Sequence, residues 1–233
     1  MADVYGSNSE LYTDPALAEG VDYARRFRRH AVFDDSEAGG VAYPDTVVVA
    51  LHGGGIEPGT SELCLAIAGY HPAGGESGGA VLDYWIFEGI RAVGNAVLHV
   101  TSVHCDDPVA VATVAGSRRT VSLHGCTPEQ ARVAGTGNEA AVLVGGRDAG
   151  LKAGLLAAYC AAGFQAIDAD RVPELNGDEP ENITNRNLSG AGVQLELTTP
   201  LRESMFEVNT RSGRKDSTRQ SFWDFVGATR AVL

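Results

Sequence analysis

The hydrophobic residues of this chain fall into short apolar runs separated by glycine-rich turns and longer helix-like segments. Residues 46–51 are β-branched or apolar throughout, a pattern typical of a strand buried on both faces of an α/β sheet. Residues 193–197 alternate strictly, which places Gln194 and Glu196 on the face opposite the apolar residues. Other runs predict strands at 84–87, 96–101, 120–125, 140–146 and 164–167.

Helix-like segments lie between these runs. We predict helices at 63–68, at 151–162, where Gly163 suits the position after a helix end, and at 221–232. Near the N-terminus, Asp14 and Pro15 predict the start of a short helix over 16–19. The alternation of strands and helices favours an α/β fold. We expect one domain, 1–233, with residues 1–40 packed on it as an N-terminal extension.

Charge and composition exclude several classes of protein. The net charge of −12 argues against nucleic acid or an anionic membrane as the main partner. No apolar run approaches the roughly 18 residues of a membrane span, and the N-terminal residues do not resemble a signal peptide, so the sequence leaves the localisation unknown. The four cysteines form no CxxC pair and do not indicate a disulfide framework. The charge is uneven, because residues 182–233 carry seven basic and five acidic side chains.

Candidate chemistry follows the first buried strand directly. His52, three glycines, Ile56 and Glu57 place an imidazole and a carboxylate at the end of this strand, where open α/β sheets hold their ligands. Both side chains can reach one metal ion because the glycines let the backbone fold back. A histidine that only bonds backbone in a glycine-rich turn is an equally good interpretation of this segment.

A second strand ends in the same way, with His124 followed by glycine. If the two strands lie side by side, His52 and His124 come within range of one ion, and this favours the metal hypothesis. His99, inside the predicted strand 96–101, is interpreted as a core or inward polar residue. A rival hypothesis uses Ser77 in a G-x-S-x-G match as a nucleophile, with His-Gly-Gly-Gly as the oxyanion-hole segment. It is disfavoured because no strand precedes Ser77.

Several segments taken in order resemble the poly-γ-glutamate hydrolase family of bacteriophages and bacteria. They are HGGGIEPGTSEL, FEG, LHVTS, VSLHG, GGRD and GVQLEL. The resemblance implies a zinc peptidase with a carboxypeptidase A-like fold, a three-layer sandwich whose central sheet is mixed and largely parallel. It implies that His52, Glu57 and His124 bind zinc and that Glu196 is the general base or acid. The implied reaction is hydrolysis of the γ-glutamyl amide of poly-γ-glutamate.

A γ-linked polyglutamate carries a free α-carboxylate on every unit, so its recognition requires fixed cations. Candidate substrate-binding residues are Arg147, Arg186 with its neighbour Asn185, and Arg202, although each arginine could equally form a structural ion pair. We expect a monomer that acts on this anionic polymer. Alternatives are a zinc amidase acting on another γ-glutamyl or peptidoglycan-type amide, the Ser77 hydrolase, and a metal-stabilised binding protein without turnover.

Overall fold

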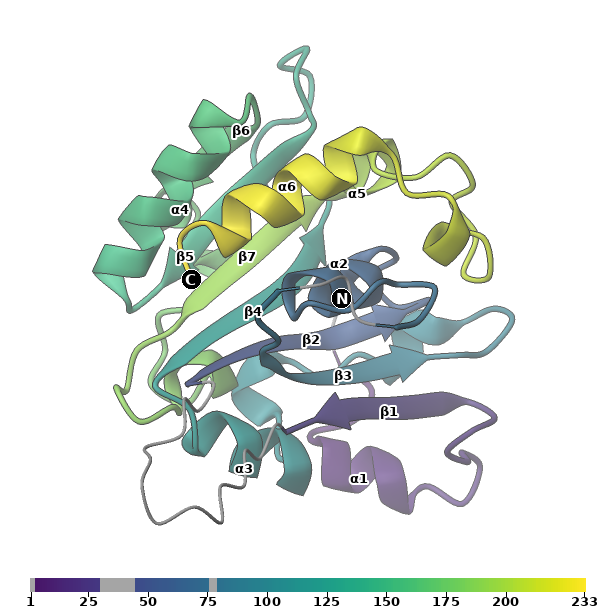
Figure 1. The fold of residues 1–233 in the computed structure, drawn as a ribbon. Coiled ribbons are helices and arrows are strands. Elements are labelled where there is room, and N and C mark those ends of the chain that lie inside the picture. Colours follow the sequence, from purple (N-terminus) through teal and green to yellow (C-terminus); the bar gives the residue numbers. More distant parts are fainter. Residues whose placement is uncertain (1–2, 30–44, 76–78) are drawn as a thin grey trace.

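A mixed sheet forms the centre of the computed structural model, which describes residues 3–29, 45–75 and 79–233 (Figure 1). Its seven strands lie in the order β1-β3-β2-β4-β7-β5-β6. Four of the six strand pairs are parallel, and the pairs β1–β3 and β5–β7 are antiparallel. The strands are β1 (Tyr23–Arg28), β2 (Thr46–Gly54), β3 (Asp83–Gly89), β4 (Arg119–Cys126), β5 (Ala141–Gly146), β6 (Gln165–Asp168) and β7 (Val193–Thr198).

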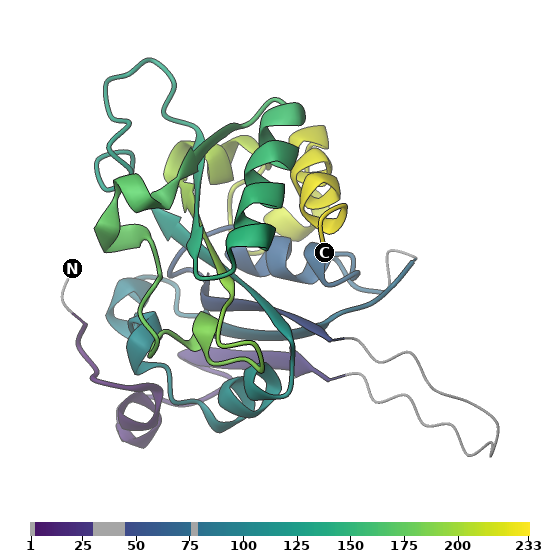
Figure 2. The same ribbon diagram turned by 90° about the vertical axis from the view of Figure 1, so that its left-hand side faces the viewer.

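Helices cover both faces of the sheet, as Figures 1 and 2 show. Helices α2, α4 and α6 pack on one face, and α1 and α3 pack on the other with irregular segments and short 3-10 turns. The expected three-layer α/β sandwich with a largely parallel sheet is therefore confirmed. The helices are α1 (Asn8–Thr13), α2 (Thr60–Ile67), α3 (Pro108–Ala115), α4 (Ala149–Ala161), α5 (Thr199–Ser204) and α6 (Gln220–Arg230).

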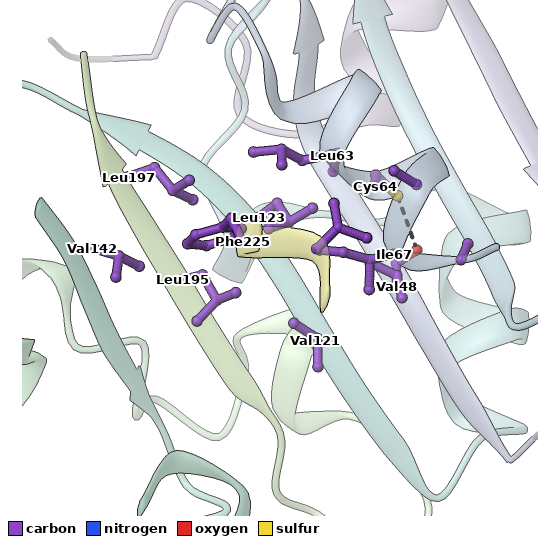
Figure 3. Packing of buried hydrophobic residues seen from close by; sticks show 14 of the residues in the cluster. Val48, Leu63, Cys64, Ile67, Val121, Leu123, Val142, Leu195, Leu197 and Phe225 are labelled. Atoms are coloured by element: carbon purple, nitrogen blue, oxygen red, sulfur yellow. Dashed lines mark hydrogen bonds between the residues drawn. The ribbon is translucent and has the colours of Figure 1, made fainter. Parts of the chain in front are cut away.

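The larger apolar core lies between the sheet and α2, α4 and α6. Figure 3 shows Val48, Val121 and Leu195 of three neighbouring strands facing Ile67 of α2 and Phe225 of α6. Every residue of β2 is buried, as expected for a strand covered on both faces. This packing fixes the central strands, and β2, β4 and β7 all end at the same edge of the sheet because they are parallel.

Two predicted elements are wrong. Residues 96–101 do not form a strand: Asn95–Leu98 is a 3-10 turn, and the Asn95 side chain bonds the backbone N–H and carbonyl of Arg91. Strand β3 is already paired on both sides, with β1 and β2, so its edges are occupied. The N-terminal helix is α1, capped by Ser7, and Asp14 lies at its C-terminal end rather than at the start of a helix over 16–19.

The segment before β2 also contributes to the sheet, because β1 is its edge strand. Of the expected extension over residues 1–40, residues 1–2 and 30–40 lie outside the described part of the chain. Among the helices of the described residues, none has the length and apolar character that crossing a membrane requires.

Candidate metal centre

His52 and Glu57 meet at the end of β2, where the chain turns tightly before α2. The Glu57 N–H donates to the His52 carbonyl at 2.8 Å, which folds the carboxylate back toward the imidazole. The turn requires glycine twice. A Cβ on Gly53 would lie 2.3 Å from Ser61 Oγ, and Gly54 has a φ of +67° and approaches the Gly89 carbonyl. The glycines between the two side chains therefore serve close backbone packing.

His124 joins this pair from the adjacent strand β4. Its Nδ1 lies 3.1 Å from His52 Nδ1, and His52 Nδ1 lies 3.1 Å from Glu57 Oε1. One ligand atom from each of these three side chains lies within 4.8 Å of the other two. His52 and His124 are 2% and 4% exposed, so the cluster is shielded from bulk water.

The other polar atoms of the three side chains are held by neighbours. His52 Nε2–H donates to the Val100 carbonyl at 2.9 Å, His124 Nε2 lies 3.2 Å from Ser102 Oγ, and Glu57 Oε2 accepts from the Gly125 N–H at 2.8 Å. A neutral imidazole that donates through Nε2 has its lone pair on Nδ1. The Nδ1 atoms thus face the carboxylate as potential ligands, which is the arrangement that a metal ion requires.

The charges of the cluster depend on one another. Burial alone would raise the pKa of Glu57, but His52, His124 and His99 together hold it at about 2. Burial opposes protonation of His52, yet Glu57 and the Val100 carbonyl outweigh it and raise the pKa of this histidine. Burial and the proximity of His52 lower the pKa of His124 to about 3. His52 and Glu57 therefore stabilise each other's charged forms at the position that a divalent cation could take.

Two imidazole nitrogens and one carboxylate oxygen are a donor set typical of zinc with one coordination position left open. Because the three ligand atoms converge while their outer atoms are already bonded, the residues fit such an ion without rearrangement of the fold.

Glu196 of β7 lies beside the cluster. It pairs in register with His124, so both side chains extend from the same face of neighbouring strands. Gln194 Nε2–H donates to Glu196 Oε1 at 3.1 Å, and Glu196 is only 6% exposed. Burial and then repulsion from Glu57 raise the pKa of Glu196 well above its ordinary value, although Arg202 and Gln194 oppose this.

Arg202 of α5 is the predicted cation that reaches the site. Its guanidinium donates to the Leu197 and Pro58 carbonyls and to Thr199 Oγ1 at 3.1, 2.8 and 3.1 Å. Three of its five N–H groups are thereby used. The side chain lines a pocket of about 280 Å³ together with Glu57. A Cβ at Gly125 would lie 2.6 Å from the guanidinium carbon, so glycine makes room for this cation.

Known proteins resemble this chain in both sequence and structure. A model of the family described as poly-gamma-glutamate hydrolase matches residues 39–228. This chain belongs to the poly-γ-glutamate hydrolase family. The relatives YndL and prophage-derived YoqZ of Bacillus subtilis (strain 168), both called UPF0714 proteins, are 31% and 33% identical to it over 180 residues, 77% of this chain. The match spans 64% and 58% of their own lengths, so the chain covers less than two thirds of these curated relatives.

Two solved structures are similar over nearly their whole length. The structure of a bacteriophage poly-gamma-glutamate hydrolase is 29% identical with a TM-score of 0.79, covering 99% of this chain and 96% of its own. A second structure, described as YNDL-apo (Zinc-free), is 28% identical with the same TM-score and covers 100% of this chain and 98% of its own. This hydrolase family thus shares both the sequence pattern and the three-dimensional arrangement of the chain.

The remaining predicted substrate-binding residues do not gather at the centre. Arg147 follows β5, which runs antiparallel to β7, so Arg147 is exposed at the opposite edge of the sheet from His52, Glu57 and His124. The Asn185 side chain bonds the Gly177 and Glu179 carbonyls and the Gly192 N–H, which occupies it structurally. Arg186 is exposed and donates to the Cys105 carbonyl at 3.1 Å. Of the three predicted arginines, Arg202 is therefore the one that shares a pocket with Glu57.

The sequence favours a core or inward polar role for His99, and the structure places this side chain against His52 and Glu57. Its ring stacks on His52 at 3.8 Å between centroids, and its Nε2 is 3.9 Å from Glu57 Oε1. Asp3 holds the opposite ring atom, Nδ1, at 2.6 Å. Asp3 and His99 are 96 positions apart in the sequence, so no local pattern predicts their contact. The LHVTS segment was the only feature of the sequence that pointed to His99.

The geometry also argues against His-Gly-Gly-Gly as an oxyanion-hole segment. The Gly54 N–H donates to Ser61 Oγ and the Gly55 N–H donates to the Gly89 carbonyl, both at 2.9 Å. These two donors are already used and cannot stabilise an oxyanion without breaking the turn. Ser77, the nucleophile of that rival hypothesis, lies outside the described residues.

Proposed function

We propose that this chain is a zinc-dependent hydrolase that cleaves the γ-glutamyl amide bonds of poly-γ-glutamate, with residues 1–233 acting as one hydrolase domain. The observation that carries the proposal is the convergence of His52, Glu57 and His124 beside a buried glutamate and a buried arginine. Membership of the family and the similarity to a bacteriophage poly-gamma-glutamate hydrolase support the substrate. The zinc-free form recorded for YndL supports the choice of metal.

His52, Glu57 and His124 would hold the ion through Nδ1, a carboxylate oxygen and Nδ1. When bound, zinc supplies Lewis acidity that lowers the pKa of water toward ~7 and polarises a carbonyl. Val100 and Ser102 keep the two imidazoles turned inward through their Nε2 atoms. The buried surroundings exclude bulk water and strengthen the electrostatic interactions of the ligands.

Glu196 is proposed to move the proton. Burial and Glu57 raise the pKa of Glu196, so this carboxyl binds a proton more readily than an ordinary glutamate does. A carboxyl with a raised pKa can both accept a proton and donate it again. As a carboxylate it accepts a proton from the attacking water, and as a carboxylic acid it returns that proton to the leaving amine. Gln194 holds Oε1, so the proton is carried on the other oxygen, Oε2.

Arg202 is proposed to bind the substrate beside the scissile bond. Two of its five N–H groups are not used by the Leu197, Pro58 and Thr199 contacts. They can donate to a carbonyl or α-carboxylate oxygen in the pocket that Arg202 shares with Glu57. The anchoring contacts keep the guanidinium in place before the substrate arrives.

Removal and return of zinc test the proposal. Wild-type protein treated with a chelator should lose hydrolysis of poly-γ-glutamate and recover it on addition of zinc. Glu196→Gln should lower kcat by roughly 10²–10⁴-fold while zinc stays bound, because general acid–base catalysis contributes about that much. Asp224→Asn is the matched control, since it makes the same carboxylate-to-amide change on an exposed position of α6.

Product length by chromatography and zinc content by elemental analysis are the readouts. Turnover that persists in the chelated protein, or in Glu196→Gln at the wild-type rate, would contradict the proposal. A protein that binds stoichiometric zinc but hydrolyses no γ-glutamyl amide would be the metal-stabilised binding protein instead.

A further inference from the structure

Three adjacent hollows that share lining residues lie between the proposed metal centre and the carboxyl end of β2. The pocket of about 280 Å³ that contains Glu57 and Arg202 shares Pro58 and Asn209 with a larger hollow of about 650 Å³. That hollow shares Gly54 and Arg211 with a third of about 170 Å³. An extended ligand with one unit at the metal centre can therefore continue along this groove.

The wall of the groove is a segment over residues 206–218 that is fixed to the core. Arg214 is 2% exposed, and it donates from Nε to Glu62 Oε1 and from Nη2 to the Gly54 carbonyl, both at 2.9 Å. The base of the segment is closed by the Glu207 N–H, which donates to the Ser217 carbonyl at 2.8 Å. The segment thus presents its exposed side chains to the groove from a fixed base.

The charge that this segment adds to the groove is positive. Arg211 and Lys215 are both exposed, both line the third hollow, and neither forms an ion pair within the described residues. The other cations of the groove are compensated: Arg91 contacts Asp22 at 3.1 Å, Arg26 contacts Glu88 at 3.5 Å, and Arg214 contacts Glu62. Two uncompensated cations on a protein of net charge −12 indicate an anionic ligand.

We propose that Arg211 and Lys215 form a second carboxylate-binding subsite, which holds the γ-glutamyl chain at a distance from the bond that is cleaved. The inference rests on the proposed function and deepens it. Every unit of a γ-linked chain carries an α-carboxylate, so a chain lying in the groove brings an anion to each position along it. Arg211 can accept a carboxylate in a two-pronged geometry, and Lys215 adds a point charge beside it.

The subsite acts on long substrates only. A chain that extends from the Arg202 pocket into the third hollow gains the contacts of Arg211 and Lys215, whereas a short oligomer ends before them. These two residues touch no reacting atom, so they contribute to binding and not to the chemical step. The expected signature is a change in KM with kcat preserved.

Arg211→Gln and Lys215→Gln are the test variants, and Arg118→Gln is the matched control. Arg118 is also exposed but lies before β4, at the opposite edge of the sheet. Each test variant should raise the KM for long poly-γ-glutamate by roughly two- to five-fold, the range for an exposed ion pair. The KM for the shortest γ-linked oligomer that the wild-type protein cleaves should not change.

The outcomes separate this inference from the proposed function. An unchanged KM for the long polymer in both test variants, or an equal increase in Arg118→Gln, would overturn the subsite while leaving the zinc hydrolase intact. If zinc-loaded wild-type protein cleaves nothing, the proposed function fails, and binding of fluorescently labelled poly-γ-glutamate decides the subsite. Binding that is weakened by Arg211→Gln but not by Arg118→Gln supports it, and binding that is absent or insensitive overturns it.

Discussion

The Ser102 hydroxyl contacts His124 Nε2 at 3.2 Å. This contact orients the imidazole so that its other nitrogen, Nδ1, faces Glu57. The same function is served for His52 by the Val100 carbonyl, which no side-chain substitution can remove. Ser102 is 7% exposed, so water does not readily replace it. The orientation of His124 therefore depends on this one side chain.

Ser102→Ala should weaken zinc binding by roughly 10-fold or more, because loss of an outer hydrogen bond to a metal-bound histidine typically has an effect of that size. Competition with a chelator of known affinity measures the change directly. Ser189→Ala, which removes a hydroxyl from an exposed loop, is the control. Equal zinc affinities for Ser102→Ala and wild-type protein would show that His124 is oriented by something else.

At the level of single residues, the sequence indicated the side chains that the structure brings together at strand ends. His52 and His124 each lie near the carboxyl end of a buried strand and precede glycine, and parallel pairing of β2 with β4 brings them into contact. The arginines could not be ranked in the same way. Arg147 also follows a buried strand, but the direction of β5 is reversed, and no local pattern reveals which strand of a mixed sheet runs backwards.

At the level of elements, the pair Arg214–Glu62 joins the segment over residues 206–218 to α2. Both side chains are buried, and Glu62 Oε2 has no hydrogen-bond partner within the described residues. Burial raises the pKa of Glu62, and Arg214 opposes this rise. Removal of Arg214 would leave a carboxylate in the same buried position without its counter-ion.

Arg214→Met should therefore destabilise the fold by about 3–5 kcal/mol near neutral pH, as expected when one partner of a buried ion pair is removed. The loss should shrink as the pH falls. Without Arg214, the pKa of Glu62 in the folded state lies still further above its value in the unfolded chain, ~4.3. The folded state therefore binds a proton more tightly than the unfolded state does. The free energy of unfolding declines as the pH rises from ~4.3 through the raised pKa.

Denaturant unfolding of Arg214→Met at several pH values checks this slope, and the double variant Arg214→Met/Glu62→Gln is the control because it has no carboxyl to titrate. If the loss of stability in Arg214→Met were the same at every pH, lost packing and not the isolated Glu62 carboxylate would be responsible.

The elements also show where sequence patterns fail. Strand β2 was recognised because its first residues are apolar on both faces, and β7 because its residues alternate. Strand β1 was not recognised, because it contains Arg25, Arg26 and Arg28. Charged residues are common on edge strands, where they discourage pairing with another molecule. The run over 96–101 has the composition of a strand, but both neighbours of β3 were already in place. Which strands flank β3 is a property of the whole sheet, and no local pattern in residues 96–101 reveals it.

At the scale of the whole molecule, the net charge of −12 opposes the approach of a polyanion. The repulsion acts over long distances and is screened beyond ~8 Å at physiological salt, whereas contacts with buried cations such as Arg202 are screened much less. Salt therefore favours binding by screening the long-range repulsion and opposes it by screening the contacts with local cations. The first effect acts at longer distances than the second.

We expect the KM for poly-γ-glutamate to fall as salt rises from a very low concentration to a moderate one, because long-range repulsion is removed first. At higher salt the KM should rise again as the exposed contacts of Arg211 and Lys215 weaken. Initial rates across a salt series at constant pH and zinc concentration measure this curve. A KM that rises monotonically from the lowest salt would mean that the local cations, and not the overall charge, govern the approach of the polymer at every distance.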